Sequence, residues 1–351
     1  MIITVILFIL IFGLIVISHE FGHFLLAKLN GIHVVEFAVG MGPTLFHFRK
    51  GETKYSLKAF PIGGACMFEG EDGLASKEGE PEEGSFLSAS VGARISAVVA
   101  GPLFNLILAY ILCLIVVAFD GSNRPVIQNV LPGSAAEAAG MQSGDLITKI
   151  NGERIHLGDQ VFLISALNQG EELTVEYLRN GEKSIVTVTP VYDNGAGRYY
   201  MGFAGVSEYF QCRGLEVFQH GFYKLEYWVS STFKSLGMLF SGRVTKDDVA
   251  GPVGIAQLVG NTYEEAKPYG ISSVILSMMN IAVLLSVNLG ILNLLPVPAL
   301  DGGRLVFLLI EAIRGKPVPP EKEGMVHLAG MAALMVLMVM VLFNDIARIF
   351  S

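Results

Sequence analysis

The residues with the clearest chemical meaning form the run His19-Glu20-Phe21-Gly22-His23 near the start of the sequence. On a helix, this H-E-x-x-H spacing puts two imidazoles one turn apart on the same face, close enough to bind one Zn²⁺. Glu20, beside the first imidazole, can act as general base on a water at that metal. The alternative is a polar contact between helices or the remnant of a lost site. Ionisable side chains inside an apolar stretch are costly, which favours a functional site here.

A catalytic zinc ion normally has three protein ligands and one open position, so a third ligand must come from elsewhere in the chain. Asp301 is the best candidate, because it follows a long charge-free stretch in the run N-L-L-P-V-P-A-L-D-G-G, residues 293–303. Pro296 and Pro298 cannot continue an α-helix, and irregular backbone inside a membrane is tolerated only where it lines a cavity. A simple cap of the helix that follows, expected at 303–314, would account for Asp301 equally well.

The composition is that of a membrane protein, with 52% hydrophobic and 16% charged residues. Soluble domains contain roughly 25% charged residues. Apolar stretches long enough to span a bilayer occur at 1–28, 95–119, 271–300 and 325–347. The first of them has no positively charged start and no small-residue cleavage pattern, so we interpret it as a retained helix and not a secretory signal.

Charge and cysteine content exclude several classes of function. The net charge is −8 and there is no run of Lys or Arg, so nucleic acid is not an expected partner. The three cysteines, Cys66, Cys113 and Cys212, are far apart and odd in number, which argues against a disulfide framework or a cysteine-based zinc site. We expect no small organic cofactor. Any metal must be held by histidine and carboxylate.

The distribution of positive charge predicts the sidedness of the segments between the spans. Segment 28–94 carries seven Lys/Arg and segment 301–324 carries four, whereas the much longer segment 120–270 carries twelve. By the positive-inside rule, the two denser segments face the cytoplasm and the long one lies outside.

The long outer segment contains a small folded domain, expected at 123–206. Its alternating apolar pattern is interrupted by Asn151-Gly152 and Asn180-Gly181, the turn pairs of β-hairpins, and a helix is expected between them. The stretch VLPGSAAEAAGMQSGDLITKINGERI resembles a PDZ domain of the bacterial protease type. Such a fold implies binding of an extended peptide or C-terminus at a sheet edge. The alternative is a rigid lid or spacer that binds no peptide.

Two other segments are expected at the membrane surface. Segment 29–94 alternates around a hairpin with a charged tip at 49–52, which predicts a membrane-associated β region, followed by a flexible loop at 70–85. Segment 213–260 has mixed polarity and many aromatic residues, as in an amphipathic surface helix with a linker. The fold class is therefore a polytopic α-helical membrane protein with four transmembrane helices, a β-hairpin sheet and one extracytoplasmic PDZ-like α+β domain.

Together, HEFGH in the first span and NLLPVPALDG in the third closely resemble the site-2 protease family of intramembrane zinc metalloproteases. Further similarities are G-P-L-F-N at 101–105 and G-P-V-G-I at 251–255, and the resemblance covers essentially the whole chain. It implies His19, His23 and Asp301 as zinc ligands, Glu20 as catalytic acid/base and Asn293 as a substrate-binding residue. For Asn105 the sequence leaves two roles open, a hydrogen bond between helices or orientation of a substrate carbonyl.

The resemblance implies a bacterial plasma-membrane enzyme whose active site lies near the cytoplasmic side. Its substrates would be single-span membrane proteins such as anti-sigma factors or remnant signal peptides, with the PDZ-like domain acting as a filter. The alternatives are a membrane-anchored PDZ scaffold with a vestigial zinc site, or a zinc-dependent transporter, for which the later spans lack polar residues. The remaining histidines are interpreted as hydrogen-bonded or solvated side chains, namely His33, His47, His156, His220 and His327.

Overall fold

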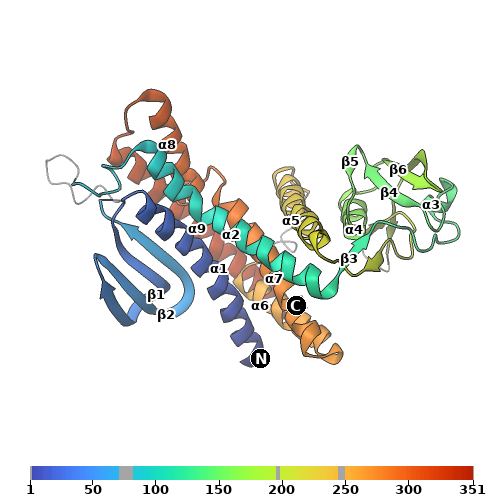
Figure 1. Ribbon diagram of the computed structural model, residues 1–351, viewed down its shortest axis with the longest axis horizontal. Coiled ribbons are helices and arrows are strands. Elements are labelled where there is room, and N and C mark those ends of the chain that lie inside the picture. The colour runs from blue at the N-terminus through green and yellow to red at the C-terminus, as the bar shows by residue number, and fades with distance from the viewer. Residues whose placement is uncertain (1, 71–81, 195–197, 244–249, 351) are drawn as a thin grey trace. The chain divides into compact units, whose positions relative to one another are not determined.

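The computed structural model describes residues 2–70, 82–194, 198–243 and 250–350, and it divides into two compact units (Figure 1). The first, called here the membrane unit, consists of Met1–Leu112 and Thr232–Ser351. The second, the β unit, consists of Cys113–Ser231.

Four helices are long and apolar enough to cross a membrane. They are α1 (Ile2–Leu29), α2 (Val91–Asp120), α7 (Ile271–Asn293) and α9 (Pro320–Phe350). The shortest, α7, has 23 residues and is therefore about 35 Å long, enough for a hydrocarbon core of about 30 Å. The four expected apolar helices are confirmed. The third, however, ends at Asn293 instead of 300, because the two prolines that follow cannot continue it.

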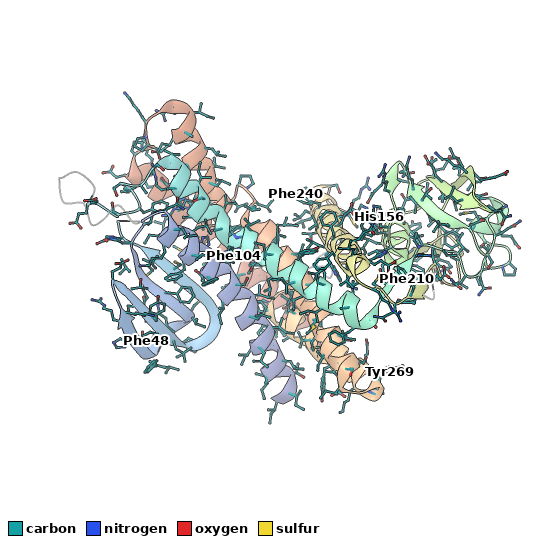
Figure 2. All side chains as sticks on the ribbon, in the orientation of Figure 1. Phe48, Phe104, His156, Phe210, Phe240 and Tyr269 are labelled. Carbon is teal, nitrogen blue, oxygen red and sulfur yellow. The ribbon has the colours of Figure 1, made fainter. Side chains whose placement is uncertain are left out.

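Glycines bring α1 and α2 into close contact. A Cβ atom on Gly22 of α1 would lie 2.3 Å from the carbonyl oxygen of Ala100 in α2. Next to this contact, the hydroxyl of Ser18 donates to the carbonyl of Phe104, the α2 residue labelled in Figure 2, at 3.1 Å. Small residues and interhelical hydrogen bonds are the usual means of holding helices together where water does not drive association.

The expected β region is a hairpin that folds back on itself, formed by β1 (Val34–Lys50) and β2 (Thr53–Phe68). Phe37 in the first half of β1 is paired with Cys66 on one side and with Tyr55 on the other. The two strands thus form four rows, with residues 64–68 at one edge and 44–50 at the other. The two outer pairs of rows are antiparallel, and the two central rows, 36–39 and 54–57, run in the same direction. The fold requires a bend at Gly40, where φ is +87° and a Cβ would lie 2.5 Å from the Phe60 carbonyl oxygen.

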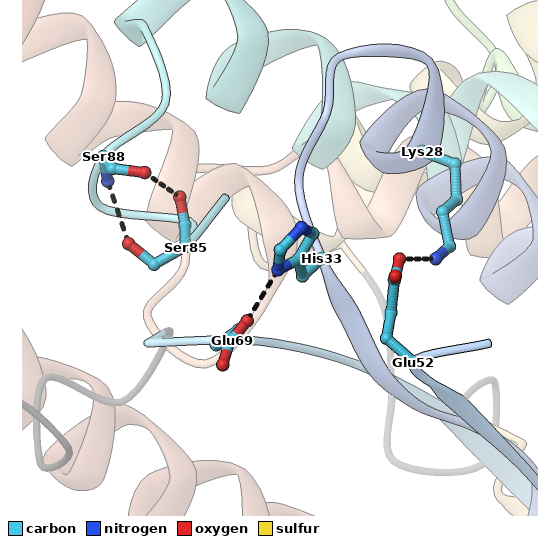
Figure 3. A network of polar contacts seen from close by, with 6 residues as sticks. All are labelled: Lys28, His33, Glu52, Glu69, Ser85 and Ser88. Atoms are coloured by element: carbon cyan, nitrogen blue, oxygen red, sulfur yellow. Dashed lines mark hydrogen bonds and ion pairs between the residues drawn. The ribbon is translucent and has the colours of Figure 1, made fainter. Parts of the chain in front are cut away.

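The outer row of the hairpin exposes several apolar side chains. Figure 2 shows Phe48 projecting from it, and Leu45 and Phe46 of the same row are also exposed, as are Leu57 and Phe60 of β2. Polar contacts, by contrast, hold the two ends of the hairpin and its turn (Figure 3). His33 Nδ1 lies 2.8 Å from the Glu69 carboxylate, and Lys28 at the end of α1 pairs with Glu52 in the hairpin turn. The loop expected at 70–85 lies mostly outside the described residues.

The β unit is built on a four-stranded antiparallel sheet in the order β5-β4-β6-β7. Its elements are β3 (Ser122–Arg124), α3 (Ala135–Ala138), β4 (Leu146–Ile150), β5 (Glu153–Arg154), α4 (Gly158–Leu167), β6 (Leu173–Arg179), β7 (Glu182–Val188), β8 (Val191–Asp193), β9 (Arg198–Tyr200) and β10 (Glu208–Phe210). Both expected Asn-Gly hairpins are confirmed, with positive φ at Asn151 and Asn180. The buried Asp145 carboxylate accepts two hydrogen bonds of 2.7 Å from Arg179.

The segment expected to contain one surface helix and a linker, 213–260, contains parts of two helices. They are α5 (Leu215–Phe240) and α6 (Pro252–Ala266), the latter followed by a short 3₁₀ turn at Lys267–Tyr269. The start of α6 is fixed by Asp345 of α9, which is 1% exposed and accepts hydrogen bonds from the N–H groups of Gly251 and Gly254. Such a cap comes from a distant side chain, so local sequence does not reveal it.

A buried ion pair joins α2 to α8 (Asp301–Arg314), the helix that begins at the candidate third ligand. Arg94 makes a bidentate contact with Glu311, at 2.5 and 3.1 Å, and both side chains are mostly buried. Removing one partner of such a pair leaves an uncompensated charge, whereas removing both is tolerated.

We therefore expect Arg94→Met to destabilise the protein by about 3 kcal/mol, seen as a lower midpoint of thermal unfolding in detergent. The double variant Arg94→Met/Glu311→Leu should recover most of this loss. Arg314→Met, which removes an exposed arginine from the same α8, is the matched control and should change the midpoint little. An unchanged midpoint in Arg94→Met alone would show that the pair does not hold α8 in place.

Candidate metal centre

The H-E-x-x-H run lies on α1, as its spacing predicts, and both of its histidines are buried. His19 is 8% exposed and His23 is 7% exposed. Their Nε2 atoms approach to 3.2 Å, so both rings aim the same nitrogen at one point. The two side chains are one helical turn apart, which is why one α-helix is sufficient to place them.

Asp301 reaches the same point from the other end of the membrane unit's sequence. After α7 the chain passes through the proline-containing turn, Leu300 is extended, and Asp301 is the first residue of α8. Gly302 and Gly303 allow this tight path, because a Cβ on either would lie 2.1 or 2.4 Å from a carbonyl oxygen of the turn. The Asp301 Oδ2 atom lies 3.2 Å from His19 Nε2 and 3.4 Å from His23 Nε2.

These three atoms fit a zinc ion. Ligand atoms at 2.0–2.1 Å from zinc with tetrahedral angles lie about 3.4 Å from one another. The three separations here are 3.2, 3.2 and 3.4 Å, and no other group of metal-binding side chains occurs in the described residues. The buried Asp301 Oδ2 has no hydrogen-bond partner in the described part of the chain, which leaves it available to a cation. Two imidazoles and a carboxylate, with a fourth position left open, are a donor set of catalytic zinc.

Helix α2 orients both imidazoles from behind. His23 Nδ1 lies 2.8 Å from the carbonyl oxygen of Ala97 and donates to it, so the lone pair of Nε2 faces the centre. His19 Nδ1 lies 3.2 Å from the Asn105 side-chain amide. Asn105 is completely buried and its Oδ1 is without a partner. Exchanging the amide oxygen and nitrogen would let Oδ1 accept a proton from His19 Nδ1, which leaves His19 Nε2 free as well.

Of the two roles open for Asn105, this geometry is that of a hydrogen bond between helices, made to a candidate ligand. Asn293 differs. It is half-buried at the end of α7, and its side chain has no hydrogen-bond partner among the described residues. Its amide is therefore available to another molecule.

Glu20 lies next to the three candidate ligand atoms without being one of them. Its carboxylate accepts a hydrogen bond from the backbone N–H of Cys66, in the edge row of the hairpin sheet. Gly64 in the same row makes this approach possible, because a Cβ there would lie 2.7 Å from Glu20 Cγ and 2.9 Å from Val16 Cγ1. This edge row of the sheet thus passes directly beside the candidate general base.

Sequence reasoning assigned no role to two contributors to the centre. One is the Cys66 backbone N–H, and the other is Gly101, where a Cβ would lie 2.2 Å from His23 Nε2. Gly101 belongs to the G-P-L-F-N motif, but only the packing of α2 against α1 gives it a purpose. It leaves the space around a ligand nitrogen empty.

Four of the other described histidines make ordinary contacts. His33 contacts Glu69, His220 Nδ1 lies 2.9 Å from the Ser122 hydroxyl, and the ring of His156 stacks on Tyr223. Burial lowers the pKa of His220. His327 lies on α9, and its Nδ1 contacts the backbone of the turn before Asp301.

Comparisons with known proteins identify relatives over nearly the whole chain. A model of peptidase family M50 matches residues 7–337. The chain is 34% identical to the zinc metalloprotease RasP of Geobacillus kaustophilus over 99% of this chain and 98% of the relative. It is 33% identical to the regulator of sigma-W protease RasP of Bacillus subtilis over 99% of each. Among solved structures, the PDZ domain of the SdrC-like protein of Listeria monocytogenes matches 22% of this chain and 83% of its own length, at 18% identity and a TM-score of 0.21.

The family match extends from α1 to α9 and includes every residue of the candidate centre. Curated relatives of the same kind agree with the chain over nearly its whole length. The chain belongs to peptidase family M50, the site-2 protease family of zinc metalloproteases.

Proposed function

We propose that this protein is a zinc-dependent intramembrane endopeptidase that hydrolyses peptide bonds within or near the transmembrane segments of single-span membrane proteins. The observation that carries the proposal is the convergence of His19, His23 and Asp301 at a buried point between apolar helices. A membrane-anchored scaffold has no need for three ionisable groups brought together from distant parts of the chain, since burying them is costly.

In this proposal His19, His23 and Asp301 hold the metal and Glu20 handles protons. A bound Zn²⁺ supplies Lewis acidity, which lowers the pKa of water and polarises the scissile carbonyl. Glu20 takes a proton from the attacking water and later delivers it to the leaving amine. Its position beside the ligands, without being one of them, suits this role. The free amide of Asn293 is placed to bind substrate, while Asn105 keeps the His19 ring in orientation.

The edge of the hairpin sheet offers a way to hold an unwound substrate. A helical peptide bond is shielded, so the substrate must become extended before it is cut, and its exposed backbone groups then need partners. Residues 64–68 form an edge row that pairs with β1, and Cys66 in this row contacts Glu20. Adding a substrate strand at this edge would satisfy its backbone and place a peptide bond beside the general base.

The β unit is proposed to filter substrates and to contribute no catalytic group. Residues 202–205 pair with 128–131, and α4 packs along the same segment, so that a Cβ on Gly158 would lie 2.0 Å from the Val206 carbonyl oxygen. A short strand beside a helix is the arrangement in which PDZ-like domains bind an extended chain end. A trimmed substrate would pass this domain, whereas a bulky one would collide with it.

The substrate class and sidedness belong to the same proposal. One relative is named as a regulator of sigma-W, which supports membrane-bound anti-sigma factors as substrates, besides remnant signal peptides. The density of Lys and Arg supports a plasma-membrane location with the hairpin on the cytoplasmic side and the β unit outside.

The roles of the site residues are separable by metal analysis. We expect Glu20→Gln to bind about one zinc per chain and to lose cleavage of a single-span substrate by a factor of about 10² to 10⁴. Asp301→Ala should lose both zinc and activity, because only two ligands remain. Zinc content of purified protein and cleavage in detergent are measured on the same samples. Loss of zinc in Glu20→Gln would contradict its role as base.

The sidedness is testable with single cysteines in a background that lacks Cys66, Cys113 and Cys212. Arg49→Cys in the hairpin and Glu182→Cys in the β unit are both exposed positions. With an impermeant thiol reagent, Glu182→Cys should be labelled in intact cells and Arg49→Cys only after the membrane is opened. Labelling of both in intact cells would overturn the four-span topology.

The filter role is testable by deletion. Strands β3 and β10 pair with each other, so that Arg124 lies opposite Glu208 and the two ends of the deleted segment are close together. A short Gly/Ser linker can therefore replace residues 125–207. We expect the shortened enzyme to cleave a trimmed substrate at a rate within about threefold of the full chain, since no proposed catalytic group is removed. It should also gain cleavage of an untrimmed substrate. A zinc-loaded deletion variant that cuts neither substrate would show that the domain is needed for catalysis.

A further inference from the structure

The turn that carries Asp301 contains a strained residue. Ala299, two positions before the candidate ligand, has a φ of +74°, in the left-handed region that residues with a Cβ avoid. Leu300 then returns to an extended conformation and Asp301 starts α8. A non-glycine residue keeps such a conformation only when its surroundings impose it. Something outside the turn must therefore hold Ala299 in place.

Helix α9 makes that contact. The Ala299 backbone N–H donates to His327 Nδ1 at 2.9 Å, across 28 positions of sequence. One turn further along α9, Gly330 lets the helix approach the turn closely, because a Cβ there would lie 2.4 Å from Pro298 Cβ and 2.7 Å from its carbonyl oxygen. The fourth apolar helix thus contacts the proline turn in two ways, through the backbone at Gly330 and through the hydrogen-bond acceptor of His327.

We propose that His327 is a positioning residue for the metal centre: by accepting the Ala299 N–H, it holds the left-handed turn that aims the Asp301 carboxylate at His19 and His23. The inference rests on the proposed role of Asp301 as zinc ligand. It gives α9, which supplies no ligand, a defined part in metal binding. His327 acts on the metal through the backbone and touches neither metal nor substrate.

The chemistry at this position requires an acceptor on the Nδ1 side of the ring. Nδ1 accepts when the ring proton is on Nε2, which faces Glu323 at 3.8 Å. An asparagine places its amide oxygen near the position of Nδ1, whereas the longer glutamine places it near Nε2. Leucine fills a similar space without any acceptor. Substitutions at His327 therefore separate the hydrogen bond from the packing of α9.

The test measures zinc affinity of the purified full-length protein by competition with a chelator, together with kcat/KM for a single-span substrate. His327→Leu and His327→Gln should each raise the zinc Kd about tenfold and lower kcat/KM by a similar factor, the lower end of effects seen for residues that orient ligands. His327→Asn should stay within about threefold of the wild type. Leu328→Ala, an exposed neighbour on α9, is the matched control and should leave both quantities unchanged.

A second arm tests the mechanism through Ala299. Glycine adopts the left-handed conformation without a steric penalty, so the turn no longer needs to be held. In the Ala299→Gly background, His327→Leu should therefore raise the zinc Kd by less than about threefold, compared with about tenfold in the wild-type background. A general weakening of α9 would not be relieved by this change. Equal effects of His327→Leu in the two backgrounds would overturn the proposal.

The outcomes distinguish this inference from the proposed function. If Asp301→Ala keeps the wild-type zinc Kd, the ligand set is wrong and both proposals fail. If Asp301→Ala loses zinc while His327→Leu and His327→Gln bind it normally, only the role of His327 is refuted. If His327→Leu fails to fold, the comparison of His327→Gln with His327→Asn still tests the role of His327. Equal zinc affinities in those two variants would refute that role.

Discussion

The structure depends on one constraint. The ionisable side chains of His19, His23 and Asp301 must come together in buried surroundings that contain little water. Two imidazoles and a carboxylate lie within hydrogen-bonding distance of one another beside an apolar helix pair. Each needs partners that fix its orientation, since an unsatisfied polar group in such surroundings is costly. The Ala97 carbonyl and the Asn105 amide supply those partners for the histidines. The tight turn before α8 does the same for Asp301.

Glycine is the means by which these partners come close enough. Gly22 and Gly101 let α2 approach α1, Gly64 lets the sheet edge approach Glu20, and Gly330 lets α9 approach the proline turn. In each place a methyl group would overlap an atom of the opposing segment. Backbone thus comes close to the centre, or to the turn that carries Asp301, at each of these places. Backbone carbonyls and N–H groups are fixed dipoles, which need little reorganisation when charge develops beside them.

The sequence predicts those parts of the centre that obey a local period. His19 and His23 are one helical turn apart, and two prolines at spacing two must end α7. The shared face of the two imidazoles and the broken helix could therefore be anticipated. The hairpin turns at Asn151 and Asn180 follow from local chemistry in the same way. The fold of the β1–β2 sheet could not be anticipated from the sequence. The alternating pattern of a strand segment is the same whether that segment pairs with one neighbour or with two. The start of α6 was missed because its cap, Asp345, is supplied by a helix far along the chain.

The folded-back hairpin has a consequence for which bonds are cut. A strand added to the edge at residues 64–68 is positioned by its backbone, and its side chains alternate between the two faces of the sheet. Sliding that strand by one residue exchanges the faces, whereas sliding it by two restores the same presentation. Neighbouring cleavage products should therefore differ in length by two residues more readily than by one. Recognition of this kind depends on the alternation of side chains along an extended substrate. The identity of any single side chain has a smaller influence on where the substrate is cut.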